Sequence, residues 1–123
     1  MNAKYGKGGI QSGEFDKMGM NLYFNNITTD GTEQTLFDVT ITAHHAFYIF
    51  CNNMQDGDSI RINVYVWDDE AGVYRNMHER VLEDIQYYPP FFDSFLPSSH
   101  YKVTIQQDNG TYRSFNWTRV EVT

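Results

Sequence analysis

The run His100-Tyr-Lys-Val-Thr-Ile-Gln-Gln-Asp-Asn-Gly-Thr-Tyr-Arg-Ser-Phe-Asn-Trp117 sets the expectation for the whole fold. Apolar and polar residues alternate on both sides of Asp108-Asn109-Gly110, which is a strong turn signal. A three-residue loop there places Val103 opposite Phe115 and yields one apolar and one polar face, whereas a two-residue loop places Val103 opposite Asn116. The sequence therefore predicts a terminal β-hairpin whose apolar face packs on a second layer of strands.

Upstream stretches alternate in the same way. In residues 15–27 the pattern places Met18, Met20, Leu22 and Phe24 on the buried face, and residues 35–42 alternate just as clearly. The run 46–51 is apolar at nearly every position, which favours a strand covered on both faces.

A second hairpin is expected between residues 59–67 and 73–82. Its pairing places Val73, Met77 and Val81 on the same face as Ile60, with the turn at the acidic stretch 68–72. A short helix over residues 76–84 is the alternative for the second arm. The adjacent prolines at 89 and 90 favour a loop or a one-turn helix over residues 91–96.

Together these patterns predict an all-β protein, an antiparallel β-sandwich of about seven or eight strands. The length of 123 residues suits a single domain, here residues 14–123. Residues 1–13 are rich in Gly and Lys and are expected to form a flexible arm.

Composition excludes several function classes. The formal net charge of −7 leaves no basic footprint for nucleic acid. No apolar run approaches the roughly 20 residues of a membrane span, and the start of the chain lacks the apolar core of a signal peptide. We therefore expect synthesis in the host cytoplasm without a signal peptide, and a chain that is a monomer or a weak homo-oligomer in isolation.

The residues that could carry chemistry do not form a recognisable site. His44 and His45 are adjacent, so in a strand they point to opposite faces and cannot bind one ion. The acidic stretches 56–58 and 68–70 lack the ligand spacing of a calcium loop, and Cys51 lies in an apolar run. We expect no catalytic residue, no metal and no cofactor, and hence a non-enzymatic protein.

Aromatic side chains are the remaining candidates for binding. Tyr65 and Trp67 fall on the polar face of their strand, with partial burial under the N-terminal arm as the alternative, and a second group surrounds the two prolines. The predicted binding residues are Tyr65, Trp67, Tyr87, Tyr88, Phe91 and Phe92. The alternative for the second group is that Phe92, Phe95 and Leu96 close the open end of the sandwich.

The final stretch also carries a resemblance. The phrase Tyr-x-Val-Thr-x-Gln-x-x-Gly-Thr-x-Arg-x-Phe-x-Trp within residues 100–117 resembles the terminal hairpin of small proteins from the tail-gene regions of long-tailed bacteriophages that infect Gram-positive bacteria. Such proteins are similar to the β-sandwich shoulder modules of phage receptor-binding and baseplate proteins. The resemblance implies a virion-associated structural or accessory protein without catalysis, whose partners are other virion or tail proteins. The alternative is a carbohydrate-binding module that recognises a cell-wall polysaccharide, a host surface glycan.

Overall fold

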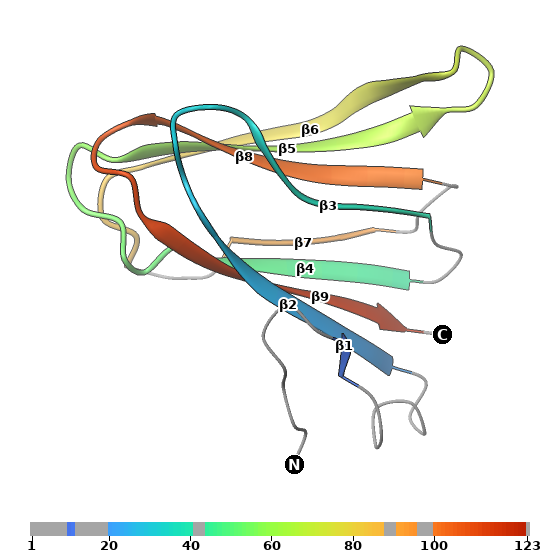
Figure 1. Cartoon of the computed structure of the whole chain (residues 1–123), viewed down its shortest axis with the longest axis horizontal. Helices are drawn as coiled ribbons and strands as arrows, with labels where there is room; N and C mark the ends of the chain where they lie inside the picture. Colours follow the sequence, from blue (N-terminus) through green and yellow to red (C-terminus); the bar gives the residue numbers. More distant parts are fainter. Residues whose placement is uncertain (1–9, 12–19, 41–43, 88–90, 96–99, 123) are drawn as a thin grey trace.

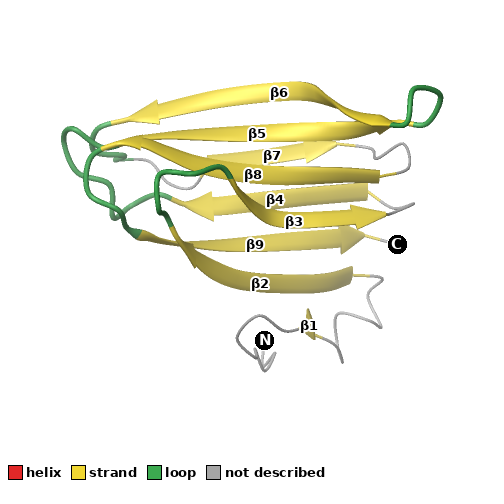
Figure 2. Cartoon of the chain, turned by 45° about the horizontal axis from the view of Figure 1, so that its top comes forward, coloured by secondary structure: helices red, strands yellow, loops and turns green. Residues whose placement is uncertain are grey.

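The computed structural model describes residues 10–11, 20–40, 44–87, 91–95 and 100–122. These residues form two antiparallel sheets that face each other as two layers (Figure 1), and the part of the chain described contains strands and loops but no helix (Figure 2). Sheet A has the order β1 (Ile10–Gln11), β2 (Met20–Thr28), β9 (Ser114–Val122), β4 (His44–Phe50) and β7 (Phe91–Phe95). Sheet B has the order β3 (Gln34–Thr40), β8 (His100–Asn109), β5 (Ser59–Asp68) and β6 (Val73–Glu83).

The strand order defines the topology. With β1 set aside, the sheets β2-β9-β4-β7 and β3-β8-β5-β6 have the order of an eight-stranded jelly roll, in which two Greek keys are wound together. The predicted all-β sandwich is confirmed. Both helix alternatives are wrong, because residues 76–83 belong to β6 and residues 91–95 form β7.

The prediction of a terminal hairpin is wrong as well. β8 pairs with β3 and β5, β9 pairs with β2 and β4, and the turn after Asn109 carries the chain from one layer to the other (Figure 1). The alternation of apolar and polar residues predicts only which side chains face inward. Val103 and Phe115 both face inward, but from opposite sheets. A hairpin and an arch between layers therefore share one hydrophobic pattern.

The core lies between the two sheets, and both sheets contribute to it. Phe37 meets the rings of Phe47 and Tyr101 edge to face, with 5.7 Å between ring centroids in both pairs. The buried apolar residues are Leu36, Phe37, Phe47, Ile49, Cys51, Met54, Ile60, Ile62, Val64, Tyr101, Val103, Ile105, Phe115 and Trp117.

The orientation of β2 differs from the expectation. Tyr23 and Ile27 pack against the core, whereas Leu22 and Phe24 lie on the outer face of sheet A in register with Val120 and Thr118. Both faces of this strand are apolar, so its own sequence does not decide which one turns inward. The pairing with β9 decides it, and the predicted buried face is wrong; Met18 lies outside the described residues.

The expectation that 46–51 is covered on both faces is also wrong. Phe47 and Ile49 are fully buried, but Ala46 and Tyr48 are half-buried and Phe50 is 39% exposed on the outer face of sheet A. A continuous apolar run is compatible with one-sided burial when the outer face is itself apolar.

The second hairpin is confirmed, with a change of face along β6. β5 and β6 pair from Asp68↔Val73 to Ser59↔Glu83, and a bulge shifts the register between Val64 and Tyr65. The extra residue reverses which side chains face inward, because the strand period is two. Past the bulge, Val81 therefore lies opposite Arg61 and is exposed, and Met77, which falls at the bulge, is exposed as well. Val73 keeps the predicted pairing, opposite Asp68, but is exposed at the hairpin tip.

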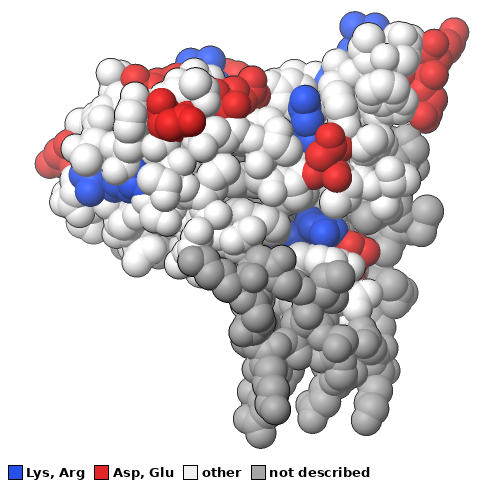
Figure 3. Space-filling view, viewed as in Figure 1, with Lys and Arg blue, Asp and Glu red and all other residues white. Residues whose placement is uncertain are grey.

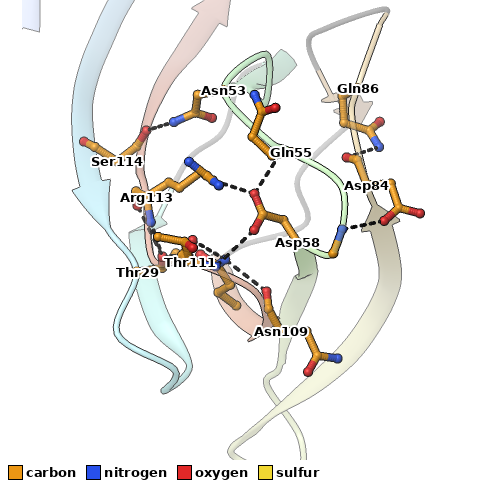
Figure 4. A network of polar contacts seen from close by, with 12 residues as sticks. Thr29, Asn53, Gln55, Asp58, Asp84, Gln86, Asn109, Thr111, Arg113 and Ser114 are labelled. Carbon is orange, nitrogen blue, oxygen red and sulfur yellow. Dashed lines mark hydrogen bonds and ion pairs between the residues drawn. The ribbon is translucent and has the colours of Figure 1, made fainter.

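A polar network holds the loops at one end of the sandwich (Figure 4). Asp58 is buried, and its carboxylate accepts hydrogen bonds from Arg113 Nε at 2.5 Å, Gln55 N at 2.8 Å and Thr111 N at 3.1 Å. Burial disfavours the charged form, but these donors, the Arg113 guanidinium first, keep the pKa of Asp58 below its usual value. The arch from β8 to β9 is thereby tied to the loop before β5.

A second cluster of polar side chains is buried around Arg119 of β9. Arg119 donates to His45 Nε2 at 3.0 Å and to Glu121 at 2.6 Å, and its guanidinium stacks on Tyr23 at 3.9 Å. Burial, followed by the charge of Arg119, lowers the pKa of His45 to about 3. His45 is therefore neutral at pH 7, and because Nε2 accepts from Arg119, its ring hydrogen is on Nδ1.

The arm over residues 1–13 stays a prediction. Within it, Ile10 and Gln11 form β1 and pair with Tyr23 and Leu22 of β2. Residues 1–9 and 12–13 lie outside the described part.

Candidate functional site

The outer surface of sheet B carries a cluster of aromatic and charged side chains, called the aromatic face here. It consists of Glu33, Asp38, Tyr65, Trp67, Tyr74, His100, Lys102 and Thr104. Strand pairing brings these residues together, because Trp67 lies opposite Tyr74, Tyr65 opposite Lys102, and Lys102 opposite Asp38. Four strands therefore contribute to one surface.

Three rings form its centre. Trp67 and Tyr74 are 5.0 Å apart between centroids at an interplanar angle of 78°, and Tyr74 and His100 are 5.4 Å apart at 74°. Trp67 and His100 are also close, at 5.9 Å. Edge-to-face contacts of this kind hold each ring in one orientation.

Two carboxylates accept hydrogen bonds from the tyrosine hydroxyls of this face. Asp38 Oδ1 accepts from the Tyr74 hydroxyl at 2.5 Å and lies 2.6 Å from His100 Nε2. Glu33 Oε2 accepts from the Tyr65 hydroxyl at 2.5 Å and from Thr104 Oγ1 at 2.6 Å.

Lys102 extends over the same rings. Its Nζ lies 4.4 Å from the centroid of Tyr74 and 5.1 Å from that of Tyr65, within the range of cation–π attraction. The cluster thus combines a positive charge, two negative charges and four rings on a surface that belongs to rigid strands.

The electrostatics of the cluster follow from these contacts. Burial and the adjacent Asp38 carboxylate raise the pKa of Tyr74 to about 12, and burial and Glu33 raise the pKa of Tyr65. Hydrogen bonds from Thr104 and Tyr65 lower the pKa of Glu33; burial opposes ionisation of Asp38, but the bonds from Tyr74 and His100 lower its pKa. At pH 7 the carboxylates are ionised and the hydroxyls are neutral donors.

This arrangement suits recognition better than catalysis. An activated nucleophile or base needs a pKa shifted toward neutrality, whereas Tyr74 is shifted away from it. His100 Nε2 contacts both Tyr74 and Asp38, so the histidine does not link them through its two ring nitrogens. The Asp38 side chain is 42% exposed and that of His100 is 34% exposed, which leaves polar atoms accessible to a partner.

The predicted binding residues fall in different parts of the molecule. Tyr65 and Trp67 belong to the aromatic face, whereas Tyr87, at 79% exposed, follows β6 at the opposite end of sheet B from Trp67. Tyr88 and the side chains of Phe91 and Phe92 lie outside the described residues, as do those of the alternative group that closes the sandwich.

The structure corrects the backbone expected around Phe91 and Phe92. Residues 91–95 form β7, which pairs with β4 at the edge of sheet A. Prolines exclude a central strand, but an edge strand can begin directly after them. The predicted loop or helix is therefore wrong.

Tyr74, His100 and Lys102 were missed by sequence reasoning. The pairing predicted for the β5–β6 hairpin already placed Tyr74 opposite Trp67, so the sequence was sufficient to predict this contact. The sequence pattern did not predict the contacts of His100 and Lys102, because they depend on the pairing of β8 with β3 and β5.

Other candidate residues have structural contacts. Asp68 Oδ1 accepts from the backbone of Glu70 and Ala71 and so shapes the hairpin tip, where acidic side chains crowd the upper right of Figure 3. Cys51 is 1% exposed and its thiol donates to Ile49 O at 3.4 Å. Across the described ranges, no three His, Cys, Asp or Glu residues form a group that could hold a metal ion. Those ranges also contain no helix with the length and apolar character of a membrane span.

Comparison with known proteins gives distant likenesses. No family model matches the chain, and no curated protein matches it. A protein of Bacillus endospore appendages, described as a family of disulfide-linked pili, is similar over 99% of this chain and 98% of that chain, with 14% identity and a TM-score of 0.47.

Two viral structures are similar over part of their length. A mutant VP2 protein of infectious bursal disease virus, in derived T=1 particles, matches 81% of this chain with 13% identity and a TM-score of 0.44. The Gx strain of the same virus matches 85% of it with 13% identity and a TM-score of 0.41. The chain spans 29% and 32% of those viral chains. With TM-scores below 0.5, these likenesses leave function to be inferred from the site itself.

Proposed function

We propose that this chain is a non-enzymatic binding module of a virion, associated with a phage tail, and that it contacts another virion protein through the aromatic face. The observation that carries the proposal is the fixed arrangement of Trp67, Tyr74 and Tyr65. Both tyrosine hydroxyls donate hydrogen bonds to carboxylates, and the rings of Trp67 and Tyr74 pack at a defined angle. A surface ordered before binding loses little side-chain entropy when a partner arrives.

The kind of residue also favours a protein partner. Tyrosine and tryptophan are the side chains most enriched among those that dominate binding energy at protein interfaces. Charged groups at the margin, here Lys102 and Asp38, add specificity and steer the encounter. The resemblance of the final strands to tail-region proteins supplies the virion setting, although the hairpin that it implied is not formed.

Site-directed photo-crosslinking tests the proposal. A benzoylphenylalanine in place of Trp67 should crosslink to one virion protein in particles produced from the genome that encodes this chain. The matched control carries the same group in place of Tyr112, which is 55% exposed but lies outside the aromatic face. Crosslinks from both positions to the same proteins, or from neither, would count against this surface.

A carbohydrate is the second candidate partner, and one observation favours it. The half-exposed Asp38 carboxylate lies beside the ring cluster of Trp67 and Tyr74, and sugars bind to surfaces that combine ring faces with hydrogen-bond acceptors. Jelly rolls serve in capsid proteins and in lectins, so the fold accommodates either partner. Titration with host wall teichoic acid and peptidoglycan fragments distinguishes them: binding that Trp67→Ala abolishes would favour the glycan.

A further inference from the structure

One oxygen of the Asp38 carboxylate takes part in both of its hydrogen bonds. Oδ1 accepts from the Tyr74 hydroxyl at 2.5 Å and from His100 Nε2 at 2.6 Å, since an ionised carboxylate can only accept. A carboxylate oxygen offers about two acceptor positions, so those of Oδ1 are taken. Within the described part of the chain no donor reaches Oδ2, and the side chain is 42% exposed. The aromatic face therefore holds an oriented carboxylate whose second oxygen is accessible to a partner.

The surroundings of this carboxylate are acidic. On the aromatic face, Glu33 and Asp38 outnumber the single ammonium group, that of Lys102. The tip of the β5–β6 hairpin adds the three acidic residues 68–70, against the one guanidinium of Arg75 (Figure 3). The formal net charge of −7 extends the negative potential over the whole chain. A basic partner is attracted to this surface, whereas an acidic partner or a second copy is repelled.

Aromatic rings lie beside the same carboxylate. Tyr74, which donates to Asp38, packs against Trp67 with 5.0 Å between ring centroids, and Trp67 lies 5.9 Å from His100. Trp67 and Tyr74 are half-buried, so part of each ring faces solvent. The guanidinium of arginine suits such a surface, because it is flat and weakly hydrated, donates to carboxylates and stacks on rings. The compact, strongly hydrated ammonium of lysine suits it less well.

We propose that the protein bound at the aromatic face presents a basic segment, and that an arginine of this segment donates to Asp38 Oδ2 with its guanidinium beside Trp67. The proposal rests on the proposed function, since it names the chemistry of the partner at the same surface. Because Oδ1 is already engaged, the guanidinium makes a single hydrogen bond instead of a bidentate pair. The rings then orient its plane.

Photo-crosslinking from a position next to Asp38 tests the chemistry of the partner. Thr40 is exposed and lies two residues further along β3, on the same side of the strand, where it pairs with His100. A benzoylphenylalanine in place of Thr40 leaves every residue of the aromatic face unchanged. In particles produced from the genome that encodes this chain, we expect a crosslink to one virion protein. The crosslinked peptide should contain an arginine within a few residues of the attachment point.

Removal of one charge tests the contact itself. Asp38→Asn keeps an oxygen that accepts from Tyr74, but it replaces the second acceptor oxygen by an NH₂ group, to which a guanidinium cannot donate. The crosslinking yield from position 40 should fall about tenfold. Asp108→Asn is the matched control, because Asp108 is a carboxylate of the same sheet that pairs with Arg61 outside the aromatic face. The control should leave the yield unchanged.

An exchange of charges gives a second readout. Asp38→Arg alone should abolish the crosslink, and so should replacement of the partner's crosslinked arginine by aspartate alone. The two changes together should restore most of the yield, because they re-create the ion pair with its signs reversed. Restoration requires a folded aromatic face, so this result stands even where Asp38→Asn disturbs the rings.

The outcomes distinguish a failure of the arginine contact from a failure of the proposed function. A crosslink to a virion protein that Asp38→Asn leaves unchanged, or one in a peptide without arginine, would overturn the arginine contact alone. A crosslink to a polysaccharide, or no crosslink from position 40, would contradict both the arginine contact and a virion protein as the partner.

Discussion

At the scale of single residues, Gly110 and Asp58 show how closely the arch between the layers is packed. Gly110 has a φ of +94°, and a Cβ at this position would lie 2.7 Å from the Asp58 Cα. That contact is with backbone, so no side-chain rotation relieves it. The turn between β8 and β9 therefore requires glycine both for its conformation and for space.

Gly110→Ala should cost about 3 kcal/mol of unfolding free energy, because the clash adds to the cost of a left-handed backbone. Gly57→Ala is the matched control, since Gly57 has a φ of +91° but nothing within 4 Å of its Cβ position. The control should lose about 1 to 2 kcal/mol. Urea denaturation measures both values, and equal losses would show that the contact with Asp58 is unimportant.

His45 makes stability depend on pH. Its pKa falls from 6.5 to about 3 on folding, so between these values the unfolded chain binds a proton that the folded chain does not. Stability is therefore present near neutrality and is lost as the pH falls. The loss from this group amounts to about 2 kcal/mol between pH 7 and pH 5.

His45→Gln should flatten that dependence, because glutamine retains an acceptor for Arg119 but does not titrate. The exposed neighbour gives a control, and His44→Gln should keep the slope of the original protein. Unfolding free energies at pH 5, 6 and 7 provide the measurement. A slope that His45→Gln leaves unchanged would assign the acid sensitivity to other groups.

At the scale of elements, the alternation of apolar and polar residues predicted most strands but not which strands pair with one another. The pattern of Val103, Ile105 and Phe115 identified which side chains are buried, and the β5–β6 hairpin was found because its turn is local. The pairing of β8 with β3 and β5 joins residues about sixty and forty positions away, as in Asp38↔Lys102 and Asn63↔Thr104. The two-residue alternation within a strand is the same whichever strand it pairs with, so it does not reveal such long-range pairing.

The same limit applied to the candidate site. Tyr65 and Trp67 were predicted because they stand on the polar side of one strand, and Tyr74 was predictable from the hairpin register. His100 and Asp38 come from strands whose neighbours only the complete topology reveals. The bulge in β6 was equally hidden, because one extra residue reverses the faces without altering composition.

Engineered disulfides distinguish the arch from a hairpin. Asn26→Cys with Asn116→Cys should crosslink under mild oxidation, because these residues are opposite each other in β2 and β9. Lys102→Cys with Asn116→Cys should not, although the hairpin register would place them side by side. Mass spectrometry of non-reduced protein gives the result, and a crosslink in the second variant alone would restore the hairpin.

At the scale of the whole molecule, the jelly roll presents two outer surfaces with different chemistry. Sheet B carries the charged aromatic face, whereas the rows Leu22–Val120–Ala46 and Phe24–Thr118–Tyr48 across sheet A contain no Asp, Glu, Lys or Arg. Burial in the core explains neither surface, since both point away from it. The proposed binding role accounts for the surface of sheet B.

Incorporation of the protein into particles tests the proposed role of the aromatic face most directly. Trp67→Ala removes the central ring, whereas Tyr112→Ala removes an exposed aromatic ring elsewhere and serves as the control. We predict at least a roughly tenfold loss of incorporation for Trp67→Ala, as for a side chain that dominates an interface, and no loss for Tyr112→Ala. A folded Trp67→Ala protein that enters particles as efficiently as the original chain would contradict the account.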